Sequence, residues 1–273
     1  MNPVTFRSRV RLAVDDGGIA TVNLSRPEKH NGVDFPMIQA LLDAARHVRR
    51  NSSIRAVILK GEGLSFCAGL DVKGVMRDRR RVLRVFFEIF SPVRNIFQRV
   101  NLVWRELPVP VVAVIHGNCF GAGLQLAAGA DLRFATPDAR LSIMEAKWGL
   151  VPDMGAMVTL RRLVNRDHLL DLMLTARVVE AAEAQRIGLV TEVHADPEAA
   201  ARGWLAQVLG RSPDAIDATK KLLNASEAAS DHGALAAERK WQRRIMGRFN
   251  QRQAVSKHMG GAGGAYRPSR FRR

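Results

Sequence analysis

The sequence has few cysteines. Cys67 and Cys119 are the only two, and no C-x-x-C spacing is present, which excludes a zinc site built on cysteine and a disulfide framework. The first residues also lack the apolar core of a signal peptide. These absences fit a protein of the reducing cytosol, so we expect a cytoplasmic chain.

The sequence contains no clean hydrophobic run of membrane-spanning length. The one charge-free stretch of that size, Leu107 to Ala130, is interrupted by prolines, glycines and polar side chains. We therefore read it as a strand, a turn and a buried helix, and we expect no contact with a membrane.

Acidic residues are scarce relative to basic ones. Lysine and arginine number 42 against 26 aspartates and glutamates, a net charge of +16, which suggests an anionic partner or substrate. Nucleic acid is one candidate, and a solvated basic face without a partner is the alternative. The excess is local: residues 239–273 hold no acid, and a second cluster comprises Arg77, Arg79, Arg80, Arg81 and Arg84.

The apolar pattern predicts one main α/β domain in the 273 residues. Val10–Val14 and Ile19–Leu24 flank a D-D-G-G turn and form a predicted hairpin, and a helix over 36–50 and a buried strand over 56–60 follow. Further on we predict a strand over 109–115, a helix over 121–129, strands over 132–135 and 141–143, and mainly helices from residue 158.

Two loops of small residues each follow a buried strand, at 65–71 and at 116–125. Small residues let a backbone approach a ligand closely, and a helix N-terminus offers free N–H groups to developing negative charge, so the pair could form an oxyanion hole. A dinucleotide fingerprint is the rival reading of the second loop. It fails because Leu126 stands where the third glycine belongs, and because no acidic residue lies about twenty positions on at the end of a second strand, as ribose binding requires.

Other catalytic patterns are absent. No serine lies in a G-x-S-x-G context, and no two histidines have metal-binding spacing. We expect no metal and no redox cofactor.

Five segments resemble the crotonase (enoyl-CoA hydratase/isomerase) family in order and spacing. They are R-P-E-K-x-N at 26–31, F-C-A-G-x-D at 66–71, H-G-x-x-x-G-A-G at 116–123, E-x-x-x-G-L-x-P-D-x-G at 145–155 and A-x-x-A-x-x-I-G-L-V at 181–190. The resemblance implies a spiral core of ββα units at residues 1–200 that holds an acyl-CoA site. It further implies a helical trimerisation region at 201–256. We expect residues 257–273, behind a glycine-rich linker, to be a flexible basic tail.

The resemblance also implies a binding site for a thioester. Its carbonyl would be held by the N–H groups of Ala68 and Ala122. The coenzyme A portion, the only cofactor implied, would lie against residues shared with the motifs: Arg26, Lys29, Cys67, Gly69, Leu70, Asp71, Val72, Gly121 and Gly123. The arginines at 77–84 could hold its phosphates or form an exposed helix face. The aromatic stripe of Phe86, Phe87, Phe90 and Phe97 could line an acyl pocket, but is more often simply core.

Glu145 is the predicted acid/base. In the family a second carboxylate commonly stands at the position of Gln125, and an amide cannot exchange a proton at neutral pH, so we favour double-bond isomerisation over hydration. Asp153 matches an acid of the dienoyl-CoA isomerases, or is a turn former. Hydration of a 2-enoyl-CoA and RNA binding by a crotonase-like protein remain alternatives, and we expect a homotrimer or a dimer of trimers.

Overall fold

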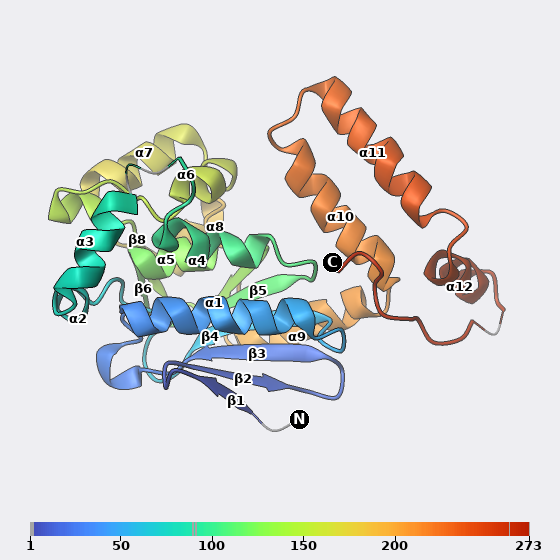
Figure 1. Cartoon of the computed structure of the whole chain (residues 1–273), viewed down its shortest axis with the longest axis horizontal. Coiled ribbons are helices and arrows are strands. Elements are labelled where there is room, and N and C mark those ends of the chain that lie inside the picture. Colours follow the sequence, from blue (N-terminus) through green and yellow to red (C-terminus); the bar gives the residue numbers. More distant parts are fainter. Residues whose placement is uncertain (1–2, 89, 91, 262, 273) are drawn as a thin grey trace.

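A computed structural model describes residues 3–88, 90, 92–261 and 263–272, without the side chains of Arg79, Arg81, Arg84 and Val85. A seven-stranded sheet lies at the centre, and an arm of helices extends from it near the C-terminus (Figure 1). Among the described residues no helix is long and apolar enough to cross a membrane.

The main sheet has the order β1-β2-β3-β4-β5-β7-β10. Its strands are β1 (Val4–Phe6), β2 (Val10–Val14), β3 (Ile19–Leu24), β4 (Ala56–Gly61), β5 (Val111–Ile115), β7 (Leu132–Ala135) and β10 (Glu192–Val193). The first three strands are antiparallel, and those from β3 to β10 are parallel. The predicted hairpin is confirmed at both strands, whereas β1 was not predicted.

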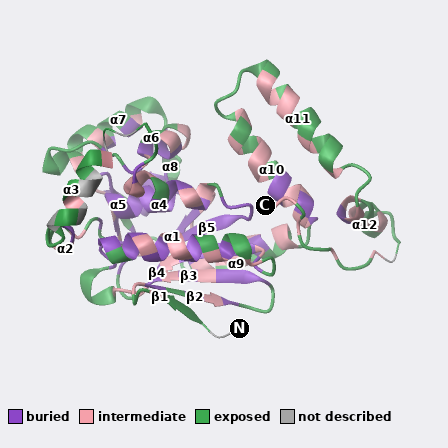
Figure 2. Ribbon diagram, in the orientation of Figure 1, coloured by how far each residue is buried: buried purple, intermediate pink, exposed green. Residues whose placement is uncertain are grey.

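Helices cover both faces of the sheet, which explains why β4 is apolar without alternation. Val57 and Leu59 of β4 belong to the larger core, with α1 (Phe35–Arg50), α4 (Ile96–Arg105) and α5 (Ala122–Ala128). Ile58 faces the other side and packs with Leu205 of α9 (Pro197–Leu209). Figure 2 shows burial concentrated in these strands and in the inner faces of the helices.

A second sheet has three strands in the order β6 (Asn118–Phe120), β8 (Arg140–Ser142), β9 (Val179–Glu180). The remaining elements of the body are η1 (Pro27–Lys29), α2 (Val72–Met76), α3 (Arg79–Glu88), η2 (Glu145–Trp148), α6 (Ala156–Thr159), η3 (Leu160–Arg162), α7 (Arg166–Thr175) and α8 (Ala181–Arg186). This sheet joins the loop after β5 to the segment that carries Glu145.

The C-terminal arm consists of α10 (Pro213–Ser226), α11 (Asp231–Ile245) and α12 (Phe249–His258). It projects from the body of the molecule (Figure 1). The expected boundary at residue 200 falls inside α9, which packs on the sheet.

The tail behind the arm, expected to be flexible, lies folded back onto the body in this structure. Its backbone N–H of Arg270 donates to Asp214 over 3.0 Å, and Arg272 Nη1 donates to the carbonyl of Asn51 over 2.6 Å. Both contacts join the tail to segments far away in sequence.

The aromatic stripe is the main error in the predicted core. Phe86, Phe87 and Phe90 are exposed by 53%, 62% and 74%, and only Phe97 packs against the core, with its ring centroid 6.2 Å from that of Phe35. The helix breaks between α3 and α4, so the three exposed rings lie on a short peripheral helix and on the segment after it instead of on one long buried face.

Candidate active site

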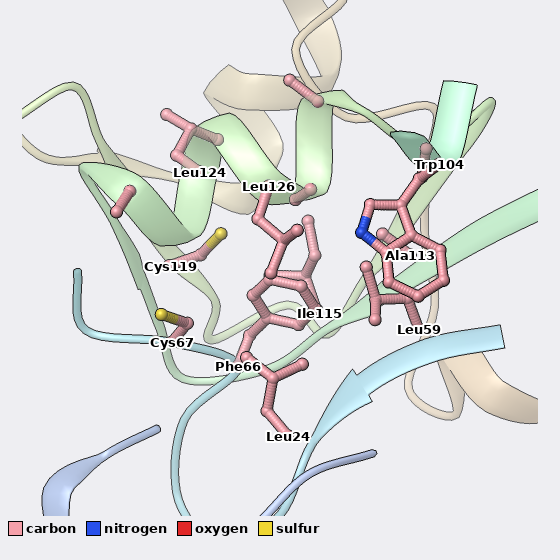
Figure 3. Packing of buried hydrophobic residues seen from close by; sticks show 14 of the residues in the cluster. Leu24, Leu59, Phe66, Cys67, Trp104, Ala113, Ile115, Cys119, Leu124 and Leu126 are labelled. Carbon is pink, nitrogen blue, oxygen red and sulfur yellow. The ribbon is translucent and has the colours of Figure 1, made fainter. Parts of the chain in front are cut away.

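Two loops meet where parallel strands β4 and β5 end. Cys67 and Cys119 are free cysteines that pair through a backbone β-bridge between the loops. The N–H of Cys67 donates to the carbonyl of Asn118, and the N–H of Phe120 donates to the carbonyl of Cys67, each over 3.0 Å. Gly123 permits this contact, because a Cβ at that position would lie 2.4 Å from the carbonyl oxygen of Cys67. The side chains of Cys67 and Cys119 project from neighbouring backbone segments beneath α5 (Figure 3).

The second loop supplies one free backbone donor. Ala122 is the first residue of α5, and within the described part of the chain its N–H has no hydrogen-bond partner. Gly121 before it has a φ of 47°, a conformation suited to glycine. The prediction of Ala122 as a donor is therefore compatible with the geometry.

In the first loop the predicted donor, Ala68, is wrong. The N–H of Ala68 already donates to the carbonyl of His30 over 2.9 Å, so it is not available to a substrate. Two residues further on, the N–H of Leu70 has no partner among the described residues. Leu70 is held on both sides: the N–H of Val33 donates to Gly69 over 2.8 Å, and the N–H of Asp71 donates to Val33 over 2.9 Å. The available pair of donors is Leu70 and Ala122.

The predicted coenzyme A residues divide into buried supports and exposed groups. Arg26 Nη1 pairs with Asp71 Oδ2 at 2.9 Å and with Asp34 Oδ2 at 3.2 Å, and its side chain is 12% exposed. Its guanidinium is thus committed to two carboxylates and supports the loop. Lys29 and Val72 are exposed beside it.

Asp71 links Arg26 to helix α2. Its side chain caps α2 by accepting from the N–H of Gly74 over 2.9 Å. That hydrogen bond and the Arg26 cation lower the pKa of Asp71. The remaining predicted residues, Cys67, Gly69, Gly121 and Gly123, form the backbone of the loop pair, and Cys67 is fully buried.

Glu145 begins η2 and lies beside the second loop. A Cβ at Gly121 would be 3.5 Å from Glu145 Oε1, so the carboxylate adjoins the start of α5. Gln125 Nε2 donates to Glu145 Oε1 over 2.6 Å, and Gln125 Oε1 accepts from the N–H of Met154 over 3.0 Å. Glu145 Oε2 is buried without a partner in the described structure. One oxygen is therefore fixed and the other is free.

The electrostatics of this carboxylate suit proton transfer. Burial raises the pKa of Glu145, the Gln125 hydrogen bond opposes that rise, and the neighbouring Asp153 charge adds to it. Partial desolvation also raises the pKa of Asp153, although this residue is exposed. The structure thus brings together all three predicted catalytic residues.

The basic cluster of the sequence is only partly described. Arg77 and Arg80 are exposed near the first loop, and the side chains of Arg79, Arg81 and Arg84 lie outside the described residues. No cluster of three or more histidines, cysteines or carboxylates that could hold a metal ion occurs in the described parts.

Fold and site together define a class of α/β proteins that present two backbone N–H groups and one buried carboxylate at the ends of parallel strands. The sequence model described as enoyl-CoA hydratase/isomerase matches residues 15–260. The chain belongs to this family, the crotonase family, and has its fold.

The relatives carry different activities in their names. A probable enoyl-CoA hydratase of Mycobacterium leprae is 34% identical over 210 residues, 76% of this chain and 79% of that protein. A mitochondrial Δ(3,5)-Δ(2,4)-dienoyl-CoA isomerase of Rattus norvegicus is 31% identical over 208 residues, 73% of this chain but only 63% of that protein. A putative enoyl-CoA hydratase of Thermobifida fusca, solved with acetoacetyl-CoA, is 29% identical with a TM-score of 0.77 and covers 87% of this chain and 94% of its own. The chain is thus an enzyme of this family, whose members differ in reaction.

Proposed function

We propose that the chain isomerises a double bond in an acyl-CoA thioester, with Glu145 as the only proton carrier. The observation that supports this most is the hydrogen bonding of the Gln125 amide, whose Nε2 donates to Glu145 and whose Oε1 accepts from the N–H of Met154. An amide cannot donate and recover a proton at neutral pH, so Gln125 acts by positioning Glu145.

The proposed reaction needs one base and one oxyanion site. Glu145 removes a proton from C2 of a 3-enoyl thioester, and the electron pair moves onto the thioester oxygen. The N–H groups of Leu70 and Ala122 stabilise that oxygen. The dienolate then collapses with protonation at C4 by the same carboxyl group, which leaves a 2-enoyl thioester and restores the carboxylate. No cofactor is needed beyond the coenzyme A portion of the substrate.

An acyl-CoA substrate is supported by the complex of the Thermobifida fusca relative, whose title names acetoacetyl-CoA. In this chain we assign the exposed Lys29, Leu70 and Val72 to the coenzyme A contact. Arg77 and Arg80 follow that loop and are exposed, so they are available to its phosphates.

A second candidate is dienoyl-CoA isomerisation, because Asp153 has a raised pKa and its charge acts on Glu145. In that reaction Asp153 and Glu145 would share the proton transfers. Hydration of a 2-enoyl-CoA lacks such support here, since the position of a second carboxylate holds Gln125.

We further propose a homotrimer or a dimer of trimers in the cytoplasm. Leu223 of α10 and Leu235 of α11 are 62% and 50% exposed on the arm, and an assembly would cover them. RNA binding is the less favoured alternative for the basic C-terminal region.

The test is a panel of 3-enoyl, 3,5-dienoyl and 2-enoyl thioesters assayed with the unmodified protein and with Glu145→Gln. We expect turnover of the 3-enoyl substrate and a loss of ~100-fold to 10,000-fold in kcat for the variant, because the amide keeps the shape and loses the proton transfer. Glu180→Gln, at an exposed glutamate of β9, is the matched control and should be silent.

Asp153→Asn separates the two isomerisations. It should leave turnover of the 3-enoyl substrate intact, whereas loss of dienoyl turnover would favour the second candidate. Rapid hydration of the 2-enoyl thioester that survives Glu145→Gln would contradict both.

A further inference from the structure

A basic groove lies between the folded-back tail and the body of the protein. It consists of two adjoining cavities of about 410 and 840 Å³, which share Ser52, Pro108, Ser269 and Arg272 in their walls. We call it the tail groove. Each cavity has the size of a small-molecule site.

The tail groove lies at the far end of the sheet from the candidate active site. Ser52 and Arg55 precede β4, and Pro108 precedes β5, whereas the loops with the free N–H groups follow the same two parallel strands. The strand β4 has six residues, and the five steps between them rise by roughly 3.3 Å each, so about 17 Å of strand separates the two places. The groove is therefore not the thioester site of the same chain.

The larger cavity has an excess of positive charge, although its Lys221 is already paired with Asp217 Oδ1 at 3.1 Å. Its basic lining residues are Arg49, Arg50, Lys221, Arg270 and Arg272. The one acidic residue in this lining, Glu106, is already paired with Arg94. In the described structure the exposed side chains of Arg49 and Arg50 have no hydrogen-bond or ion-pair partner.

Arg272 stands between the two cavities and is incompletely satisfied. It donates to the carbonyls of Asn51 and Ile54, but its Nε is buried without a partner among the described residues. Two effects lower the pKa of Arg272, namely burial and the nearby charge of Arg55, against the opposing charge of Asp217. An anion in the groove would offset both effects.

The wall formed by the tail is held by buried polar groups. The carboxylate of Asp214 accepts from the N–H of Arg270 and from Asn250 Nδ2, each over 3.0 Å. Ser269 Oγ donates to Asp217 over 2.8 Å. Asp214 and Asp217 are 3% and 1% exposed, so the groove is formed before any ligand arrives.

The smaller cavity has an aromatic and apolar wall. Tyr266, the only tyrosine of the sequence, lines it together with Val109, Pro213 and Ile216. Arg55, Lys257 and Arg267 stand at the same walls, and Lys257 Nζ lies 4.2 Å from the centroid of the Tyr266 ring. An aromatic and apolar wall thus adjoins basic residues of both cavities, which suits a ligand with a planar ring at one end and phosphates at the other.

We propose that the tail groove binds a nucleotide with at least two phosphates, the phosphates toward Arg49, Arg50 and Arg272 and the base toward Tyr266. This inference does not depend on the reaction at Glu145. It assigns the folded-back tail a role in forming a second ligand site.

The test is calorimetric titration of the full chain with ADP, adenosine and inorganic pyrophosphate at physiological salt. We expect saturable ADP binding, at least about tenfold tighter than either fragment, because each fragment fills one half of the groove. Arg49→Gln with Arg50→Gln should weaken ADP binding by about tenfold or more, through lost charge-assisted hydrogen bonds, and Tyr266→Leu should weaken ADP but not pyrophosphate.

The matched control is Arg248→Gln with Arg252→Gln, which removes the same charge from exposed side chains outside the groove. It should change the ADP affinity less than about twofold, as expected for a screened distant charge. Equal weakening by both pairs, pyrophosphate binding as tight as ADP, or no saturable ADP binding would overturn the assignment. ADP affinity unchanged by Arg49→Gln with Arg50→Gln would place the nucleotide elsewhere, for instance at the thioester site, and would overturn it too.

Discussion

Gln125 donates one hydrogen bond to Glu145, and this bond favours the charged form of the carboxylate. In the proposed isomerisation Glu145 acts as a base only when ionised, so turnover should fall as the pH drops through its pKa. Because the bond from Gln125 favours the charged form and lowers that pKa, Gln125→Met should move the acidic limb of kcat/KM to higher pH. The measurement is the pH profile with a 3-enoyl thioester.

Gln185→Met, at an exposed glutamine of α8, controls for the substitution itself. An acidic limb of Gln125→Met that coincides with that of the unmodified protein would show that the amide does not tune the carboxylate.

The role proposed for Ala122 belongs to its backbone N–H, so only a substitution that removes this N–H tests it. Ala122→Pro should reduce kcat by a hundredfold or more, about 3 to 4 kcal/mol of transition-state stabilisation. Ala181→Pro changes the first residue of α8 in the same way, away from the site, and reports the cost to folding. If a folded Ala122→Pro protein kept full turnover, the oxyanion would have to be held by other donors.

The error at Ala68 shows what the sequence could not determine. The motif located the loop of small residues correctly, and the glycines indicated a close backbone approach. Which N–H points at a ligand depends on which neighbours are consumed by other bonds, and the bond from Ala68 to His30 joins residues 38 positions apart. Sequence patterns carry no signal for such a contact.

At the scale of elements, Asp71 connects η1 to α2 and its contribution to stability depends on pH. Its pKa in the folded protein lies below the ordinary value of 3.8, so the stabilisation is present above that value and is lost as the pH falls through the folded pKa. Asp71→Asn keeps the helix cap and removes the charge. We expect it to unfold more easily by roughly 0.5 to 1 kcal/mol at neutral pH, and by less in acid.

Urea unfolding at neutral and acidic pH measures this difference. Asp138→Asn, at an exposed aspartate, gives the baseline. A gap between Asp71→Asn and the unmodified protein that stayed constant with pH would contradict an ionic role for Asp71.

Regular elements with strong local signals were predictable, and solvent-facing apolar ones were not. The hairpin, α1 and the buried strands follow from turn residues and apolar periodicity. The phenylalanines of α3 have the same helical periodicity as a core helix. Their exposure depends on where α3 docks, which local sequence does not specify.

At the scale of the whole molecule, the arm should determine the oligomeric state. Leu223→Glu with Leu235→Glu places charge on the exposed apolar positions of α10 and α11. We expect light scattering to give a multiple of three chains of 30.2 kDa for the unmodified protein and a single chain for the variant.

Leu64→Glu adds a charge at an exposed leucine away from the arm and should preserve the assembly. A single chain in the unmodified protein would remove the proposed trimer.

The backbone β-bridge between Cys67 and Cys119 makes the reactivity of these two thiols a measure of how often the two loops separate. Burial raises the pKa of Cys67 to about 12 and that of Cys119 well above its ordinary value, and both thiols are fully buried. A thiol reagent reacts with the thiolate, so neither sulfur should react while the two loops stay joined. The rate of thiol labelling therefore reports how often the two loops separate. A ligand that holds the loops together should slow the labelling of both sulfur atoms without contacting either of them.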